Sequence, residues 1–306
     1  MTPFDLSPRR VSAGAGAQLG AYRRMFAAVA SDVAGALGGG REDDPFSLRD
    51  PEYIENTLAA WRLTSELYFR AEVDGLDNIP ATGPVLLVGN HSGGVVIVDT
   101  FVFAQAFYDH FGPQREFFQL AHDLVFKLPG ARALVQRYGT VPASPENMAR
   151  ALERDAALLV YPGGDHETFR PSWESEEVDF AGRTGFIKLA LKHNVAIVPV
   201  VAIGGQETAL FLGQGSRSAR ALHLDRLARL KVLPAAIGPP FGLTLLDLPL
   251  RLPLPAKISI QILKPIDLRA ELGTDKDIDA GYELVTARMQ DALTGLGEER
   301  DLPIIG

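Results

Sequence analysis

The sequence predicts an α/β fold in which a mostly parallel central sheet is flanked by helices and preceded by an N-terminal helical segment. From residue 71 onward, short and almost wholly apolar runs alternate with helical stretches, and strands buried on both faces of a sheet have this pattern. The chain has 306 residues and 46% hydrophobic composition. It therefore has enough apolar side chains to bury a full core.

Two helices are expected before the sheet begins. Residues 16–38 form an Ala-rich apolar stretch that closes with consecutive glycines, which commonly end a helix. Residues 51–70 read as a second helix that opens with an Asp-Pro pair. Both are expected either to pack on the domain or to dock on a membrane. The expected division is an N-terminal helical segment over residues 1–70 and an α/β domain over residues 71–306.

The α/β pattern itself comprises four strands and four helices. The strands are expected at Pro84–Gly89, Ala157–Tyr161, Ala196–Ile203 and Ile258–Leu263, and the helices around Thr100–His110, Pro145–Glu153, Gly185–His193 and Asp279–Thr294. In a parallel sheet covered on both faces, chemistry takes place just past the carboxyl ends of the strands. Polar residues that directly follow these strands are therefore the first candidates for a functional site.

Composition excludes several classes of function. The sequence has no cysteine, which removes disulfides, thiol nucleophiles and Cys-type metal sites. Its formal net charge of −8 argues against general nucleic-acid binding, because a phosphate-binding surface needs a basic excess. The sequence contains neither an apolar run long enough to span a bilayer nor the apolar segment of a secretory signal near its start. We therefore expect a cytoplasmic polypeptide that contacts membranes only peripherally.

The first candidate for catalysis is the segment 89–94 (GNHSGG), which directly follows the first apolar strand. Substrate can reach a histidine at a strand tip, and glycines beside it let backbone or substrate approach closely. Asp99 follows His91 by eight residues. One continuous helix would separate the two side chains by about 12 Å, but the glycines and the β-branched run after them disfavour that helix. A loop can bring Asp99 to His91; alternatively, His91 is a turn residue and Asp99 a helix cap.

Two further strand tips carry residues of the same kinds. Residues 161–170 (YPGGDHETFR) follow the second apolar strand, and residues 204–208 (GGQET) follow the third. A single segment of this kind, taken alone, is better explained as a solvated turn between a strand and a helix. Three such tips together predict one shared crevice.

These motifs resemble those of the glycerolipid acyltransferase superfamily, which includes lysophosphatidate acyltransferases and the diacylglycerol acyltransferase group. That family carries, in order, a His-x4-Asp box, a Gly-containing box, a Pro-Glu-Gly or Pro-Gly-Gly box and a Val-Pro-Val box. The counterparts here are residues 90–94 with Asp99, 138–142 (YGTVP), 161–164 (YPGG) and 197–200 (IVPV). The order and spacing of the motifs cover roughly residues 71–270, which makes the resemblance far more specific than any single motif.

Two segments are similar to the neutral-lipid branch of that superfamily. Residues 162–167 (PGGDHE) resemble its Pro-Gly-Gly-x-x-Glu box, and residues 183–190 (RTGFIKLA) resemble its Arg-Lys-Gly-Phe segment. Two departures also matter. The family's aspartate falls at Val96, so Asp99 can serve only if the loop is three residues longer. The second-box arginine, associated with the phosphate of a phosphorylated acceptor, falls near Ser144, with Arg137 or Arg150 as substitutes.

The resemblance implies an O-acyltransferase that moves a fatty acyl group from acyl-CoA to a lipid hydroxyl at a membrane surface, with no bound cofactor and no metal. A neutral acceptor such as a mono- or diacylglycerol is preferred, and a lysophospholipid or lysophosphatidate is the alternative. His91 is the expected general base, because imidazole titrates near neutral pH. Asp99 is the expected orienting carboxylate, with Glu167 or Asp165 in reserve. The substrate-binding residues are expected to be Gly93, Gly94, Gly139, Pro162, Gly163, Gly164, Glu167, Arg183 and Pro199.

Transfer also needs donors for the oxyanion, and we expect these among the backbone N–H groups around Gly163 and Gly164 or in the loop after His91. An esterase or thioesterase, in which water replaces the acceptor, is one rival function; an inactive lipid-binding module is another. A serine nucleophile at Ser92 is disfavoured, because adjacent residues on an extended chain point to opposite sides. A metal site built from His91, His166 and the His122-Asp123 pair lacks the usual ligand spacing.

One basic and apolar segment is expected to meet the membrane. Residues 216–264 carry eight Lys or Arg against two acids and contain two proline-rich apolar runs. An apolar surface ringed by basic side chains suits an anionic bilayer, and we expect peripheral association with the inner face of the cell membrane. The alternative is a loop that covers the core with its charges facing water. The expected partners are acyl-CoA, a lipid acceptor and the membrane surface, without nucleic acid.

Overall fold

The structure, a computed structural model, describes most of the chain beyond residue 43. The described residues are 44–94, 96–123, 125–127, 131–213, 215, 234–244, 251–273, 277–300 and 302, together with 20, 22, 23 and 27. Most of the helix expected over residues 16–38 therefore lies outside the described residues. The same is true of residues 216–233 and 245–250 within the basic segment.

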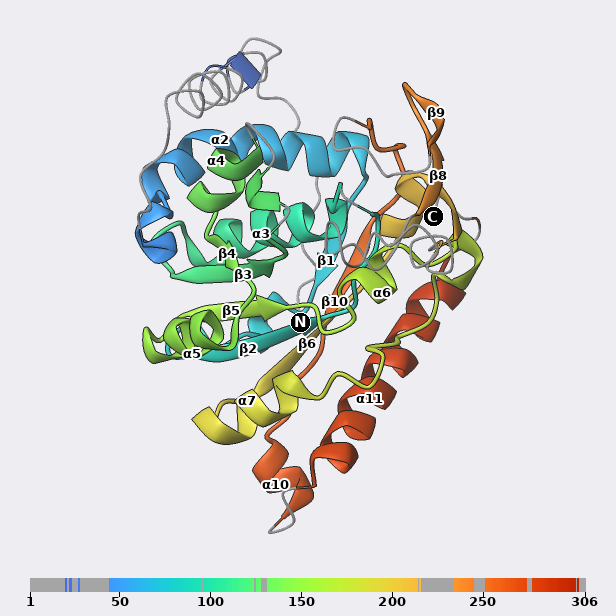
Figure 1. Ribbon diagram of the computed structural model, residues 1–306. Helices are drawn as coiled ribbons and strands as arrows, with labels where there is room; N and C mark the ends of the chain where they lie inside the picture. Colours follow the sequence, from blue (N-terminus) through green and yellow to red (C-terminus); the bar gives the residue numbers. More distant parts are fainter. Residues whose placement is uncertain are drawn as a thin grey trace.

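A seven-stranded sheet forms the centre of the structure, in the order β1-β10-β6-β2-β5-β3-β4 (Figure 1). Neighbouring strands pair in parallel except β10 and β6, which pair antiparallel. The strands are β1 (Glu72–Asp74), β2 (Val85–Gly89), β3 (Phe117–Ala121), β4 (Thr140–Pro142), β5 (Ala157–Val160), β6 (Ile197–Ile203) and β10 (Ser259–Ile262). The predicted fold class is confirmed, because the sheet is mostly parallel and carries helices on both faces.

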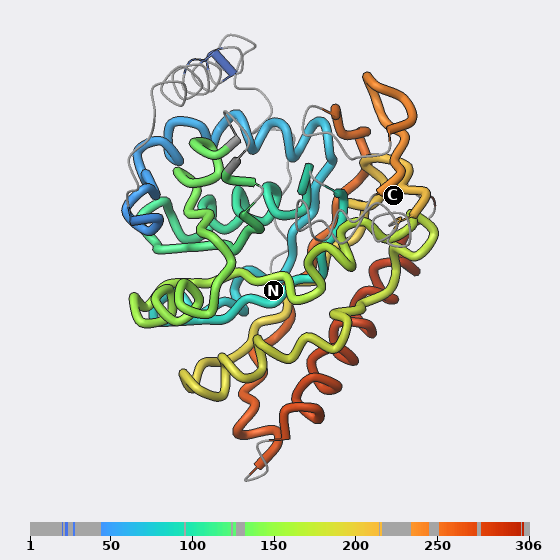
Figure 2. The backbone as a smooth tube through the Cα atoms, viewed as in Figure 1, coloured from blue at the N-terminus to red at the C-terminus, as the bar shows by residue number. Residues whose placement is uncertain are grey.

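Different helices cover the two faces of the sheet (Figure 1). Leu87 and Leu159 point to the face that packs against α2 and α3, whereas Leu86 and Leu158 point to the face that packs against α5, α7 and α11. Because successive side chains alternate between faces, a strand buried on both sides reads as an unbroken apolar run. The helices are α2 (Pro51–Leu63), α3 (Val98–Phe111), α4 (Ala131–Arg137), α5 (Pro145–Glu153), α6 (Asp165–Thr168), α7 (Gly185–His193), α10 (Leu268–Leu272) and α11 (Ile278–Glu298). The helix α11, red in the tube view of Figure 2, contacts α7, which is yellow there.

Local capping explains where several helices begin. The Asp50 carboxylate accepts the backbone N–H of Tyr53 at the start of α2, and Ser144 accepts that of Asn147 at the start of α5. Each of these caps is followed by a proline at the first helical position, where the missing N–H costs no hydrogen bond. The predicted bounds of α5 and α7 are confirmed residue for residue. The helix expected over residues 51–70 is α2, continued by a π-helical turn over Thr64–Tyr68.

A small antiparallel sheet, which the sequence pattern did not predict, follows β6. It comprises β7 (Leu210–Gly213), β8 (Ala235–Gly238) and β9 (Gly242–Thr244). Phe211 and Ala236 are buried and pack with Phe169, whereas Leu210, Ile237 and Leu243 are cross-strand neighbours exposed on the other face. Among the described helices, none combines the length and the apolar character needed to cross a bilayer.

Candidate active site

The carboxyl ends of β6, β2 and β5 lie side by side, since these strands are neighbours in the sheet and run in parallel. The loop after β2 carries His91, and both other tips contact it. Oε2 of Glu167, which follows β5, accepts the backbone N–H of His91 at 3.1 Å. Oε1 of Gln206, which follows β6, accepts the backbone N–H of Gly93 at 2.9 Å. The prediction that the three tips meet is confirmed by these contacts.

The imidazole of His91 is buried against the ring of Tyr161, with 4.3 Å between ring centroids and 21° between ring planes. Its Nδ1 is buried and has no hydrogen-bond partner. Burial, together with the positive charge of Arg170, lowers the pKa of His91 to about 3. The ring is therefore neutral at pH 7, which is the form that accepts a proton.

Asp99 does not hydrogen-bond the His91 ring. Its Oδ2 accepts the backbone N–H of Ser92 at 3.2 Å and the Ser92 hydroxyl at 3.0 Å, and its Oδ1 accepts the backbone N–H of Thr100 at 2.7 Å. The reason lies in the helix start: α3 begins at Val98 with Ile97 as its cap, so Asp99 lies in the first turn and faces the residue next to His91. Burial raises the pKa of Asp99 to about 6, against the opposing effect of the Ser92 and Thr100 hydrogen bonds. Its contact with His91 is thus indirect, and its catalytic role stays a prediction.

Glu167 is completely buried and holds three donors. Besides the His91 N–H, its carboxylate accepts Nη2 of Arg170 at 2.8 Å and the backbone N–H of Asp179 at 3.2 Å. Burial raises the pKa of Glu167 to about 8, and the charge of Arg170 opposes the rise. A Cβ at Gly163 would overlap the Glu167 side chain, so the glycine lets this carboxylate fold back over its own turn. Glu167 therefore supports the His91 backbone rather than the imidazole.

Asp165, the other reserve carboxylate, pairs with Arg183 at 2.8 Å. Arg183 also donates to the carbonyls of Pro162 and Gly163, at 3.0 and 2.6 Å. The expected substrate-binding residues Arg183 and Pro162 thus brace the turn that carries Glu167. A direct role of Arg183 and Pro162 in substrate binding stays a prediction.

The loop amides expected to bind the oxyanion already donate within the protein. The N–H groups of Ser92 and Gly93 bond the Asp99 and Gln206 side chains, and that of Gly94 bonds the Thr168 carbonyl at 3.2 Å. The Gly164 N–H bonds the Tyr161 carbonyl at 3.1 Å. The geometry therefore corrects that expectation for these four amides, because each has a protein acceptor in place of substrate.

Two expected substrate-binding residues lie within the scaffold. Gly139 precedes β4 at the amino end of that strand with φ +87°, and a Cβ there would overlap the carbonyl of Phe117. Pro199 lies in the middle of β6 opposite Val88, and its carbonyl accepts the N–H of Leu263 at 2.9 Å. The close approach of Gly139 to Phe117 and the hydrogen bond between Pro199 and Leu263 are thus contacts of the sheet itself.

The site contains supporting residues to which the sequence assigned no role. Gln206 is 1% exposed and, besides holding Gly93, donates through Nε2 to the carbonyl of Arg170. The side-chain amide of Asn90 donates through Nδ2 to the Ala202 carbonyl and accepts the Ala202 N–H through Oδ1, both at 2.8 Å. The sequence signals for these residues were their position at the strand tips and, for Asn90, its place in the first motif.

The basic segment also differs from expectation. Arg251 was counted among the membrane-facing cations, but its side chain is 4% exposed and donates to backbone carbonyls inside the protein. Lys257 pairs with Glu72 at 3.1 Å. Of the eight basic residues, those at 217, 220, 226, 229 and 231 lie outside the described residues. A count of charges along a sequence does not reveal depth, which is why Arg251 was misplaced.

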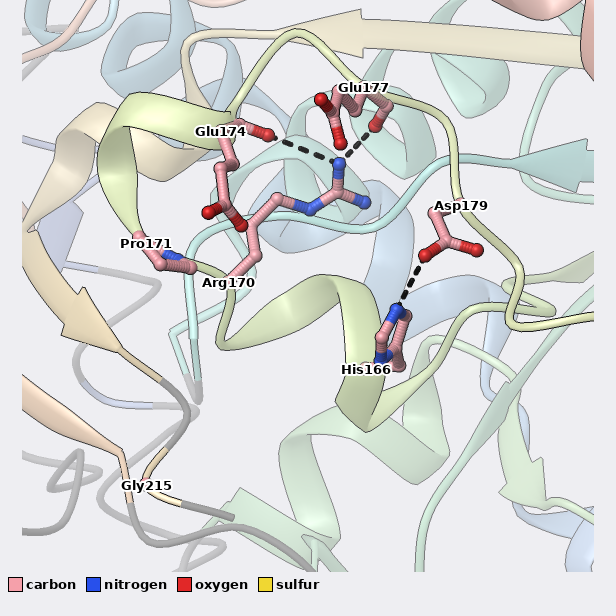
Figure 3. Close-up of a pocket in the computed structure, with 7 residues that line it drawn as sticks. All are labelled: His166, Arg170, Pro171, Glu174, Glu177, Asp179 and Gly215. Carbon is pink, nitrogen blue, oxygen red and sulfur yellow. Dashed lines mark hydrogen bonds and ion pairs between the residues drawn. The ribbon is translucent and has the colours of Figure 1, made fainter. Parts of the chain in front are cut away.

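A cavity of about 370 Å³ is lined by Arg170, His166 and Asp179, among other residues (Figure 3). Nη1 of Arg170 points to the backbone carbonyls of Glu174 and Glu177 in this cavity, whereas its Nη2 holds Glu167. His166 was a candidate ligand in the alternative metal site. In this cavity its Nε2 instead forms a hydrogen bond of 2.7 Å with Asp179. Within the described part of the chain, no three His, Asp or Glu side chains are grouped to hold a metal ion.

Comparison with known proteins bears directly on this arrangement. Residues 70–203 match the family model described as Acyltransferase. An uncharacterized protein of Mycobacterium leprae is 29% identical over 262 residues, which cover 85% of this chain and 68% of that protein. A human protein named DGAT1/2-independent enzyme synthesizing storage lipids is 28% identical over 163 residues, covering 53% of this chain and 48% of its own. Phytyl ester synthase 1 of Arabidopsis thaliana is 25% identical over 143 residues, which cover 45% of this chain and 20% of that protein.

The fold is also found among solved structures. The crystal structure of the 1-acyl-sn-glycerophosphate acyltransferase PlsC from Thermotoga maritima aligns with a TM-score of 0.51 and 17% identity, over 90% of this chain and 94% of that one. At this identity the likeness concerns the fold alone. The matched range 70–203 contains His91, Asp99 and Glu167, and the motif order resembles one superfamily. Residues 70–203 therefore match an acyltransferase family model, and the motifs within them resemble those of the glycerolipid acyltransferase superfamily.

Proposed function

We propose that this protein is an O-acyltransferase that moves a fatty acyl group from acyl-CoA to the hydroxyl of a neutral lipid at a membrane surface, with His91 as general base. The observation that carries the proposal is the state of the His91 ring. It stacks on Tyr161, and its buried Nδ1 has no hydrogen-bond partner. These features stand at the point where the superfamily's motifs converge.

In this mechanism the acceptor hydroxyl attacks the thioester carbonyl while a ring nitrogen of His91 accepts its proton. A C–O bond forms, the C–S bond breaks, and the imidazolium returns the proton to the departing CoA thiolate. Direct transfer of this kind requires no nucleophile on the enzyme, in keeping with a sequence that has no cysteine. Tyr161 and the buried hydrogen bonds of Asp99, Glu167 and Gln206 hold the loop while the proton moves.

Support for a neutral acceptor comes from the second motif. The place of the phosphate-associated arginine falls near Ser144, which caps α5. The two substitutes have other partners: Arg137 pairs with Asp50 at 3.5 Å and Arg150 pairs with Asp44 at 2.9 Å. The names of two relatives, an enzyme synthesizing storage lipids and a phytyl ester synthase, point to acceptors without a phosphate.

Peripheral contact with the inner face of the cell membrane is part of the proposal. The small sheet exposes Leu210, Ile237 and Leu243 in one cross-strand row, and contiguous exposed apolar surface is typical of interaction sites. Residues 214–234, which join β7 to β8 in sequence, carry five Lys or Arg against one Asp. Anionic lipid attracts such a segment electrostatically.

The test is acyl transfer from radiolabelled palmitoyl-CoA in liposomes that contain one acceptor at a time. The acceptors are monoacylglycerol, diacylglycerol, a long-chain alcohol, lysophosphatidate and lysophosphatidylcholine, with palmitoyl-acyl carrier protein as a second donor. We expect labelled ester from a neutral acceptor and acyl-CoA. Preference for lysophosphatidate would overturn the acceptor assignment, and release of free fatty acid alone would identify a thioesterase.

A further inference from the structure

The peptide units of Gly93 are held from both sides by buried side chains that belong to different parts of the chain. Gln206 Oε1 accepts the Gly93 N–H at 2.9 Å, and Nη2 of Arg251 donates to the Gly93 carbonyl at 3.0 Å. Gly93 has φ +92° and lies two residues after His91. The loop thus leaves β2 in a conformation that regular strand pairing does not stabilise.

The side chain of Arg251, which donates to the Gly93 carbonyl, lies in the interior of the protein. Its side chain is 4% exposed, its Nη1 donates to the Thr208 carbonyl at 2.8 Å, and its guanidinium carbon lies 5.5 Å from the centre of the Phe211 ring. Gly238 of β8 makes room for it, because a Cβ there would lie 2.7 Å from the Arg251 Cδ. A buried guanidinium is costly unless it is hydrogen-bonded, so its carbonyl contacts specify where it lies.

The backbone that carries Arg251 is anchored independently of the His91 loop. The N–H of Leu252 bonds the Pro239 carbonyl and that of Leu254 bonds the Thr208 carbonyl, both at 2.8 Å. The hydroxyl of Tyr68 donates to the Pro253 carbonyl at 2.7 Å. The donor is therefore fixed by three contacts outside the loop, and the Gly93 carbonyl is the group whose position it sets.

We propose that Arg251 is a positioning residue, which fixes the loop carrying His91 through the carbonyl of Gly93. The neutral His91 ring has no hydrogen bond at Nδ1, so its location depends on the backbone that carries it. The catalytic consequence rests on the proposed function, whereas the effect on the loop does not. Displacements of even about 1 Å at a reacting group are known to lower rates strongly.

The experiment compares the wild type with Arg251→Met, Arg251→Lys and the matched control Arg49→Met. Arg49 also donates to backbone carbonyls, those of Pro113 and Arg115, but it lies outside the strand-tip loops. Amide hydrogen exchange of the peptide spanning β2 and the His91 loop reports on the loop. Steady-state kinetics with palmitoyl-CoA and the preferred acceptor report on transfer.

In Arg251→Met we expect the Gly93 and Gly94 amides to exchange at least about tenfold faster. We also expect kcat to fall at least about tenfold with KM within about threefold. Arg251→Lys should recover part of both effects, because one ammonium donor remains, and Arg49→Met should change neither. Unchanged exchange of the loop, unchanged kcat, or equal effects in Arg49→Met would overturn the proposal. If the wild type transfers no acyl group at all, the proposed function fails, and exchange alone decides the role of Arg251.

Discussion

The imidazole of His91 lies nearly parallel to the ring of Tyr161, with 4.3 Å between the ring centroids. The Tyr161 ring is fixed at its far end, where its hydroxyl oxygen accepts a hydrogen bond of 2.7 Å from Thr100 in the first turn of α3. Gly89 leaves space for it, because a Cβ there would lie 2.5 Å from Tyr161 Cε1. Stacking therefore orients the catalytic candidate in a structure where no hydrogen bond to Nδ1 does so.

Substitutions of Tyr161 separate stacking from hydrogen bonding. Tyr161→Phe keeps the ring and loses only the contact with Thr100, so we expect kcat within about threefold of wild type. Tyr161→Leu removes the aromatic face, and we expect kcat to fall by about fivefold, in proportion to a stack of about 1 kcal/mol. Kinetics at saturating acceptor measure both effects. Equal activity of the Leu and Phe variants would show that stacking does not orient His91.

Asp99 is expected to matter first as the buried acceptor of the loop. Asp99→Ala leaves the N–H groups of Ser92 and Thr100 without their acceptor, and we expect the free energy of unfolding to fall by about 2 to 4 kcal/mol. Ser92→Ala removes only the hydroxyl bond and should cost about 1 kcal/mol.

Urea unfolding at pH 7 measures these differences, with the exposed Ser47→Ala as the control for loss of a hydroxyl bond. The hydroxyl of Ser47 donates to the Asp44 carbonyl at 2.7 Å. If Ser92→Ala were as destabilising as Asp99→Ala, the backbone contacts of Asp99 would contribute nothing.

Much of the fold was predictable because local sequence patterns mark where its strands and helices begin and end. The strands β2, β5, β6 and β10 were placed within one residue at each end, since the first three are short apolar runs buried on both faces and β10 alternates isoleucine with polar residues. α5 and α7 were placed residue for residue, because Ser144-Pro145 begins one and Asn194, with φ +53°, ends the other. In contrast, β1, β4 and β9 have three residues each, too few for any pattern to register.

The site was predictable in outline but not in its contacts. Parallel strands bring their tips together, so His91 and Glu167 were expected to be neighbours. Which atoms meet depends on tertiary detail: Asp99 turns to Ser92 because α3 starts one residue before it. The roles of Gln206 and Arg251 depend on contacts that span more than 100 residues of sequence. Such contacts leave no local signal.

A glycine substitution tests the packing around Ser92. A Cβ at Gly205 would overlap the Ser92 hydroxyl and lie 3.5 Å from the Asp99 carboxylate. We expect Gly205→Ala to lower stability by about 1 to 3 kcal/mol, as overpacking does, and to lower kcat with it.

Gly295→Ala is the matched control for Gly205→Ala. Gly295 lies inside α11 with open space around it, so alanine there should raise stability by about 0.5 to 1 kcal/mol. Thermal unfolding measures the stability of both variants, and steady-state kinetics measure their kcat. A Gly205→Ala protein as stable and active as the wild type would contradict the close approach of the two strand tips.

Stability should depend on pH through His91. Burial and the charge of Arg170 lower the pKa of His91 from 6.5 to about 3, so between these values the unfolded chain binds a proton that the folded state does not. The stabilisation of the folded state that comes from neutral His91 is therefore complete above pH 6.5 and is lost as the pH falls toward 3. Between pH 7 and pH 4, His91 should remove about 3 kcal/mol of unfolding free energy.

His91→Gln eliminates this titration but leaves the other buried acids in place. The raised pKa values of Asp99 and Glu167 act in the opposite direction, and they act in both proteins. Urea unfolding at pH 7, 6, 5 and 4 should therefore show the variant losing about 3 kcal/mol less than the wild type on acidification. Parallel curves would contradict a buried, neutral His91.

The most direct test of the account is acyl transfer by wild type, His91→Gln and the control His193→Gln in the liposome assay with palmitoyl-CoA and a neutral acceptor. His193 also has a buried ring nitrogen without a hydrogen bond, but it ends α7 just before β6 begins, at the opposite end of that strand from the site. With His91 as general base, His91→Gln should lose about a hundredfold or more in kcat with its folded spectrum intact, while His193→Gln retains activity. Transfer by His91→Gln at the wild-type rate would contradict the central claim.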